Sequence, residues 1–456
     1  MTKNQLLIVL FIWSVESFMY FPAKSQIIQS DSLNLKDAIE LGLENSRELK
    51  KAVLDEESAE LLKKEVRGSG LPQLNAYGNY NNFIEVYPQA VPSGLFGPGT
   101  PGEVDVIALG VPQSLQAGIQ ANQLLYSSSF FIGLKAAKTS EEFYRLLSSQ
   151  SEEEVIYDIS MAFLGTVQLS LHRENLLANI DQLTGLEKIV TAQVENDLAR
   201  SVDLKRIKVS LSSLNSELEN LDVSIFQNKS YLKLLMGVPQ ETDFELKKSE
   251  IISEMLPLTY SVDRLDLTER KDLQVLEMQS TLLDFEYKNT KANLHPNLVA
   301  FADYNTNSFA TEFDYLSESK NWYQGFLIGL KLQVPLFDGF VTRSKAQQVK
   351  VKKLQLQQDY SLAKDAARME YDNANKKYYN SIRTLKSLEE NLSLANEVLD
   401  ETQLLYKESL SPLTEVLDAE SAQRQARTNY NNQIVQVKIA QIEILKSTGK
   451  IKEIIL

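Results

Sequence analysis

The chain has 456 residues and a formal net charge of −14, with 43% apolar residues, 24% charged residues and no cysteine. This composition excludes a disordered chain and a polytopic helical membrane protein, and the length allows a large core or two to three ordinary domains. The acidic balance argues against nucleic-acid binding, and the lack of cysteine excludes disulfides, thiolate metal sites, cysteine nucleophiles and a lipid-modified cysteine.

The first 25 residues have the pattern of a secretory signal peptide. Lys3 precedes an apolar run from Leu6 to Val15, and the small residues Ala23 and Ser25 predict cleavage before Gln26. The alternative, a membrane anchor, is disfavoured because about ten residues are too few to cross ~30 Å of hydrocarbon. Since no later apolar run is long enough, we expect an exported chain that enters a membrane only as a closed β-barrel.

An internal duplication follows. Segments in the two halves match in the same order, and the one large change of the offset between them, by 13 residues, falls in the Gly- and Pro-rich stretch 83–117. The matched pairs are Leu49 with Leu273 (offset 224), Gly118 with Gly329 (offset 211) and Gly237 with Gly449 (offset 212). Three anchors in one order indicate a repeated structural unit.

Each repeat is predicted to begin with a helix of roughly 30 residues that ends near Gly68 or Asn293. Pro72 or Pro296 then opens a strand, where a missing N–H donor costs little. A second strand follows a polar loop, which in the first repeat includes an exposed segment from Pro92 to Gly102. Polar and apolar side chains alternate along these strands, so one face of each is polar. The polar set of the second strands comprises Gln120, Asn122, Lys331 and Gln333.

Long helices complete each repeat. The segments 130–195 and 341–407 contain no proline, and at 1.5 Å per residue they would be about 90–100 Å long. The returning helix carries apolar residues spaced alternately by three and four, from Leu204 to Ile225. This spacing is a heptad seam and predicts side-by-side, coiled-coil-like packing.

The strands and helices together predict a pore made by several chains. Four strands leave open edges, which hydrocarbon does not tolerate, so closure needs more than one copy. Two copies would give a barrel filled by side chains, whereas three would give twelve strands around a lumen. The polar set would line this lumen, and an interfacial aromatic girdle would comprise Tyr77, Tyr80, Tyr304, Trp322 and Tyr323.

The sequence resembles the TolC-like outer-membrane efflux proteins, the outer membrane factors, over essentially the whole mature chain. The matching segments are 33–38 with 44–46, the strand openings 71–72 and 295–296, the joint 334–339 and the helix start 413–419. The resemblance implies an α+β membrane protein: a trimeric 12-stranded β-barrel, four strands per chain, continued by a long α-helical coiled-coil barrel with a mixed equatorial layer.

On this resemblance the chain is expected to have five parts. They are the signal peptide 1–25, a first structural repeat 26–237, an equatorial connector 238–266, a second structural repeat 267–449 and a C-terminal equatorial tail 450–456.

The resemblance also implies that the two helix-reversing turns form a constricted entrance. Glu415 and Asp418 match the family's acidic ring; three residues apart, they share one helix face. The alternative is a solvated helix start, where the macrodipole favours acids anyway. Ringed carboxylates would favour cations. The residues expected to contact an adaptor at the two turns are Asp197, Leu198, Ala199, Ser409, Leu410 and Ser411.

A lock at the entrance is implied as well. Tyr406 matches its tyrosine and Asp203 its acidic partner. The family often has arginine where this chain has Ser411, and glycine at Asp197 and Ser409, so the lock is expected to be altered, with Arg200 as a candidate replacement cation.

The resulting hypothesis is a homotrimeric exit duct in the outer membrane of a Gram-negative bacterium, serving an efflux or type I secretion system. Its partners would be a periplasmic adaptor (membrane fusion protein), an inner-membrane transporter and outer-membrane lipid. The main alternative is a soluble periplasmic coiled-coil scaffold or adaptor, which leaves the paired strands unexplained. A porin would lack the long helices. An enzyme, a cofactor or a metal site is not expected, because no catalytic or nucleotide motif occurs and His172 and His295 have no ligand partners at metal spacing.

Overall fold

A computed structural model describes residues 32–247 and 265–455, except Phe96, Pro101, Leu109, residues 316–320 and Ser409. The signal segment 1–25, with its cleavage before Gln26, and residues 248–264 of the predicted connector lie outside the described residues. The chain divides into two compact units. The tip unit comprises Met1–Asn45, Ile159–Met255 and Ala395–Val435, and the sheet unit comprises Ser46–Asp158, Leu256–Leu394 and Gln436–Leu456.

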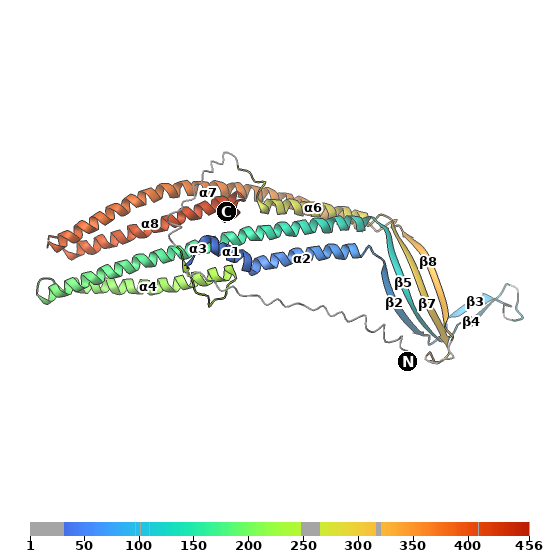
Figure 1. Ribbon diagram of the computed structural model, residues 1–456. Coiled ribbons are helices and arrows are strands. Elements are labelled where there is room, and N and C mark those ends of the chain that lie inside the picture. The colour runs from blue at the N-terminus through green and yellow to red at the C-terminus, as the bar shows by residue number, and fades with distance from the viewer. Residues whose placement is uncertain are drawn as a thin grey trace. The chain divides into compact units, whose positions relative to one another are not determined.

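The centre of the sheet unit is a four-stranded antiparallel sheet in the order β2-β5-β7-β8 (Figure 1). Its strands are β2 (Gln73–Asn82), β5 (Gln113–Ser127), β7 (Asn297–Ala310) and β8 (Tyr323–Gln333). A β-bulge interrupts the register of β5 between Leu124 and Tyr126. Two long strands per repeat, each first strand opening just after a proline, were predicted and are confirmed.

A hairpin interrupts the Gly- and Pro-rich stretch between β2 and β5. Its strands, β3 (Pro88–Pro92) and β4 (Val104–Ala108), form a separate two-stranded antiparallel sheet, and the expected loop joins them. The sequence analysis missed these strands because prolines at both ends of β3 weaken the strand pattern.

Paired helices run from the sheet. In the first repeat α2 (Arg47–Gly68) lies beside α3 (Ser128–Glu195), and in the second α6 (Lys271–Ala292) lies beside α7 (Val341–Lys407) (Figure 1). Ion pairs join the neighbours: Lys63 with Glu141 at 2.5 Å, Arg145 with Glu56 at 3.1 Å and Lys353 with Asp284 at 2.6 Å.

The predicted first helix of roughly 30 residues is wrong. A short helix, α1 (Leu35–Asn45), ends before Ser46, whose extended backbone (φ −52°, ψ 128°) separates it from α2. Both α2 and α6 have 22 residues. The long helices, by contrast, begin and end within two residues of the predicted bounds.

In the tip unit, α4 (Ser201–Met236) and α8 (Leu413–Ser447) return along the long helices. The predicted heptad seam is confirmed, because Leu214 and Leu221 of α4 form a buried cluster with Leu176 and Leu183 of α3. A short parallel pair, β1 (Ser32–Leu33) with β6 (Glu245–Leu246), also belongs to this unit. Among the residues that the structure describes, no helix combines the length and the apolar character needed to cross a membrane.

Within the sheet unit, the helix ends meet at Arg270, of which 11% of the side chain is exposed. Its guanidinium donates to Asp272 through Nη2 at 2.7 Å and Nε at 3.0 Å, and to Glu370 of α7 at 2.9 Å. Nη1 also reaches the carbonyl of Ser447, at the end of α8, at 3.3 Å. One buried cation therefore connects three helix segments, and η2 (Ile451–Ile454) follows directly after α8.

The element bounds repeat at the offsets found in the sequence. The bounds of α2 and α6 differ by 224 positions at both ends, and β2 and β7 begin 224 apart. Both compact units draw residues from both repeats. The division of the chain into repeats, connector and tail therefore stays a prediction.

Candidate functional site

Strand register gives the sheet two chemically different faces. Gln120 pairs with Asp303, and Asn122 with Phe301, so these residues share one face with Asn75, Asn305 and Asn307. Lys331 and Gln333 pair with Val299 and Asn297, which lie on the same face. The four residues predicted to form one polar set are thus brought to a single surface, here called the polar face.

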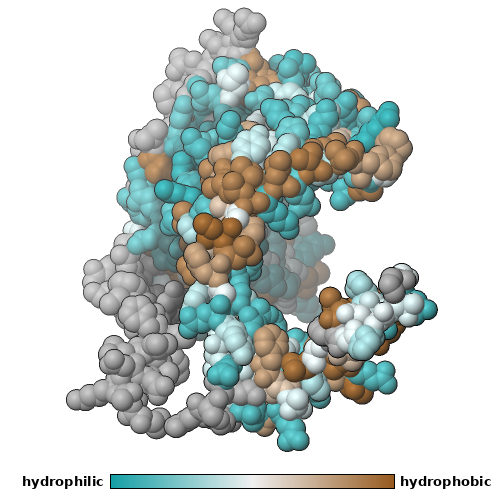
Figure 2. Space-filling model, turned by 90° about the vertical axis from the view of Figure 1, so that its right-hand side faces the viewer, coloured by the Kyte–Doolittle hydropathy of each residue, from teal (hydrophilic) through white to brown (hydrophobic). Residues whose placement is uncertain are grey.

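The opposite face is apolar and exposed to solvent in the single chain. It carries Leu74, Tyr80, Ile119, Tyr304, Phe326, Ile328, Leu330 and Leu332, all of them exposed. Looking at the end of the molecule that carries the sheet, hydrophobic side chains form a continuous brown stripe (Figure 2). An apolar surface of this extent indicates a partner or a lipid environment rather than water.

The predicted aromatic girdle needs a correction. Tyr77 pairs with Gly118 and lies on the polar face, where its hydroxyl donates to Asp303 at 3.0 Å. Tyr323 pairs with Asn307 and also belongs to the polar face. Tyr80 and Tyr304 do lie on the apolar face, and Tyr80 packs edge-on against Phe313 and Tyr315. The residue type alone suggested the girdle, whereas the register decides the face.

In the tip unit, two turns reverse the long helices at the positions expected. At the first turn Asp197 adopts a left-handed conformation (φ 60°), and the N–H of Leu198 donates to the carbonyl of Gln193 at 2.8 Å. At the second, the N–H of Leu410 donates to the carbonyl of Leu405, also at 2.8 Å. Both are the six-to-one bond of a Schellman motif. Ser409, an expected contact residue, lies outside the described residues.

These turns expose apolar side chains. Leu198 is 79% exposed and Leu410 is 75% exposed, although each is fixed by its turn. Behind them, Val190 of α3, Ile207 of α4 and Leu413 of α8 form a buried cluster against which Tyr406 packs. The two hairpins are thus packed together within the tip unit.

The predicted lock residues lie close together but are paired differently than expected. Tyr406 donates to Gln193 Oε1 at 3.2 Å, while the Nε of Arg200 donates to Asp203 Oδ2 at 3.1 Å. Asp203 is only 7% exposed. Burial, followed by the charge of Asp203, raises the pKa of Tyr406. Arg200 is therefore the cation that approaches Asp203, and Gln193 is a hydrogen-bond partner of Tyr406 that could not be anticipated from the sequence.

Glu415 and Asp418 are both exposed on the first turns of α8. Ser411, in the position of the family's arginine, donates through Oγ to Glu415 Oε2 at 2.5 Å. The neighbouring Glu420 is buried, and this burial raises its pKa to about 7 against the opposing charge of Arg424. Burial of Glu420 could not be predicted from the sequence, because a glutamate on a helix normally faces water.

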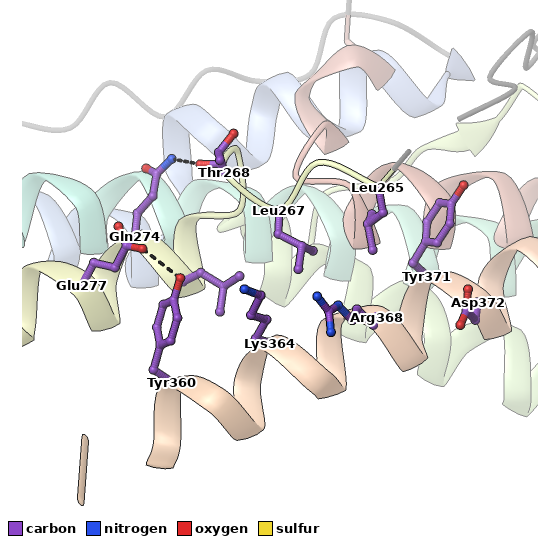
Figure 3. Close-up of a pocket in the computed structure, with 11 residues that line it drawn as sticks. Leu265, Leu267, Thr268, Gln274, Glu277, Tyr360, Lys364, Arg368, Tyr371 and Asp372 are labelled. Atoms are coloured by element: carbon purple, nitrogen blue, oxygen red, sulfur yellow. Dashed lines mark hydrogen bonds between the residues drawn. The ribbon is translucent and has the colours of Figure 1, made fainter. Parts of the chain in front are cut away.

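A hollow of about 600 Å³ lies between α6 and α7 in the sheet unit (Figure 3). Tyr360 donates to Glu277 at 2.8 Å across it, and Gln274 donates to the Thr268 carbonyl at 2.6 Å. Lys364, Arg368 and Asp372 also line it, so its charges are mixed. In the described part of the chain, no three His, Cys, Asp or Glu side chains gather as metal ligands.

Comparisons with known proteins agree with this architecture. Residues 264–450 match the family described as outer membrane efflux protein. No curated protein matches the chain. A membrane protein from Pseudomonas aeruginosa is 18% identical with a TM-score of 0.69, covering 93% of this chain and 91% of that one. VceC, an outer membrane protein of Vibrio cholerae, is 15% identical with a TM-score of 0.69, covering 91% and 96%. The CmeC outer membrane channel of Campylobacter jejuni is 15% identical with a TM-score of 0.69, covering 91% and 86%.

At these identities the structural likeness shows a shared fold, the α+β fold of these outer-membrane proteins. The match to the outer membrane efflux protein family over residues 264–450 extends this likeness to the sequence of the second half of the chain. The resemblance found in the sequence is confirmed.

Proposed function

We propose that this protein is the outer-membrane exit duct of a multi-component efflux or type I secretion system, passively conducting substrates to the exterior. The two-faced sheet carries the proposal. Its apolar face suits lipid and its polar face suits water, and both β2 and β8 have only one neighbouring strand within the described chain. Such edges need partners from other copies before the sheet can enter hydrocarbon.

A homotrimer satisfies this requirement, because three copies supply twelve strands and leave a lumen. The polar face, with Gln120, Asn122, Lys331 and Gln333, would line that lumen. The tip unit supports further copies as well. Val202, Val209 and Val223 are exposed on α4 and recur at multiples of seven, outside the seam buried against α3. An exposed row of apolar residues at heptad spacing supports packing against a helix of another chain.

At the periplasmic end, Glu415 and Asp418 would form the acidic constriction, three copies of each around one axis. Tyr406 with Gln193, and Arg200 with Asp203, would hold the entrance in its resting form. The turns would meet the adaptor through Asp197, Leu198 and Ala199 on one hairpin and through Leu410 on the other. Ser411, also expected as a contact residue, is buried and would need to be uncovered to take part, and Ser409 lies outside the described residues. An inner-membrane transporter would complete the assembly. These roles describe a conduit, so no enzymatic activity is proposed.

Cell fractionation tests the proposal against the alternative of a periplasmic scaffold or adaptor. The mature chain is expected in the outer-membrane fraction, and it should migrate as a trimer after mild detergent extraction. A soluble scaffold would need no lipid partner for the apolar face. Recovery in the soluble periplasm would contradict the duct and favour the scaffold.

A further inference from the structure

Two aromatic rings lie across glycines on the polar face. A Cβ added at Gly118 would come within 2.9 Å of Cζ of Tyr77, and one added at Gly329 within 2.7 Å of Cζ of Phe301. Each ring therefore reaches from the first strand of its repeat over the second strand. The ring covers the glycine, as when an aromatic residue shields a strand glycine, and both Tyr77 and Phe301 keep part of their surface exposed.

The arrangement is duplicated. Tyr77 and Phe301 are 224 positions apart, and Gly118 and Gly329 are 211 apart, the offsets that relate the two repeats. Both rings thus occupy equivalent places in their repeats. Any side chain at either glycine would displace the ring above it.

A carboxylate lies beside the first ring. Asp303 accepts the Tyr77 hydroxyl at 3.0 Å and the amide of Asn305 at 2.5 Å, and Asn307 in turn donates to Asn305 at 2.8 Å. No lysine or arginine within the described ranges pairs with Asp303. An ionised carboxylate has about four acceptor sites, so this one keeps capacity for a further partner while its neighbours hold it in place.

We propose that Tyr77, Phe301 and Asp303 form a binding site for organic cations on the polar face of the sheet. The inference rests on the proposed function, because this face becomes the wall of a conduit only when several copies close the sheet. A trimer would then present a belt of six rings and three carboxylates at this level.

The chemistry favours cations over other solutes. Aromatic faces attract cations within about 6 Å through the ring quadrupole, and Asp303 adds a fixed negative charge. An organic cation with an apolar part gains from the ring quadrupoles and from the charge of Asp303, whereas a carbohydrate could stack on the rings and donate hydrogen bonds to Asp303 but would gain nothing from its charge. The net charge of −14 favours cations over anions in the same way.

Single-channel recording in planar bilayers tests the site. Benzyltrimethylammonium, added on the barrel side, is expected to block the potassium current of the wild-type protein. Tyr77→Leu, Phe301→Leu and Asp303→Asn should each weaken the block about five- to tenfold. Tyr77→Phe, which keeps the ring but loses the hydroxyl beside Asp303, should give a smaller loss. Tyr304→Leu is the matched control, because Tyr304 lies on β7 with Phe301 and Asp303 but on the opposite, apolar face. This substitution should leave the block unchanged.

Other outcomes would overturn the site. A conducting protein with no block, or with a block that these substitutions leave intact, would contradict it while leaving the duct in place. If maltose blocks the current equally well and this block vanishes in the same variants, the site binds carbohydrates rather than organic cations. A protein that forms no channel at all would contradict the proposed function itself.

Discussion

At the scale of single residues, Glu420 shows how burial controls a charge near the turn between α7 and α8. Its side chain is 9% exposed, and Oε1 has no hydrogen-bond partner within the described residues. The nearest opposing charge is that of Arg424, one turn further along α8. Because the charged form is desolvated, the folded protein holds the proton on Glu420 more tightly than the unfolded chain does.

A pH-dependent stability follows from this burial. The pKa of Glu420 rises from 4.5 to about 7 on folding, so the contribution is full below pH 4.5 and is lost as pH rises to 7. The loss amounts to about 3 kcal/mol, at 1.36 kcal/mol for each pH unit. Glu420→Gln should therefore raise the thermal stability at pH 8 and have little effect at pH 4. Melting curves in detergent that shift equally at both pH values would contradict the burial of this carboxyl.

The acidic pair Glu415 and Asp418 makes a prediction of another kind. If these side chains ring the constriction, Glu415→Ala with Asp418→Ala should lower cation selectivity and raise conductance, because the charge and the bulk at the narrowest point both fall. Reversal potentials under a salt gradient measure the selectivity. Glu219→Ala, which removes an exposed acid from α4, is the control. Unchanged currents in the double variant would place the pair away from the constriction and favour solvated acids at a helix start.

At the scale of elements, periodicity located most of the fold. The absence of proline was enough for α3 and α7 and the heptad spacing for α4, since a helix and its packing face are both encoded locally. The start of α8 was placed by the family resemblance. The hairpin β3-β4 was missed because its prolines conceal the alternation. Asp303 could have been predicted as a polar-face residue, because it lies in register with Gln120 on that face. The contacts of Arg270 could not have been predicted, since it joins Glu370 and Ser447, which are far apart in sequence.

We expect helix packing to be most sensitive to substitution at Arg270. Arg270→Ala would leave Asp272 and Glu370 without their shared cation and remove the bond to the Ser447 carbonyl. A destabilisation of about 2–3 kcal/mol is expected, typical of hydrogen bonds that involve charged groups. The control is Arg145→Ala, which breaks an exposed ion pair with Glu56 and should cost less than about 1 kcal/mol. Denaturant unfolding followed by circular dichroism compares the two, and equal losses would contradict the special role of Arg270.

At the scale of the whole molecule, the duplication and the two-faced sheet both require that several copies of the chain assemble. Each repeat supplies one pair of strands, and the sheet ends at β2 and β8. The sequence analysis could count the strands and infer several copies, but register was needed to show that Tyr77 and Asp303 share the polar face. No local pattern shows which strands pair between copies, so closure of the sheet into a ring is the central proposal.

Cross-linking between edge strands tests that claim most directly. The chain has no cysteine, so Asn75→Cys on β2 can be combined, one at a time, with cysteine at Tyr323, Gly325, Leu327, Gly329 or Lys331 on β8. A disulfide needs Cα atoms within about 7 Å, so only strands that pair between copies will react. The account predicts at least one combination that yields a covalent trimer as the largest product in outer membranes. Monomers at every position, or a ladder of ever larger multimers, would contradict a closed ring of three chains.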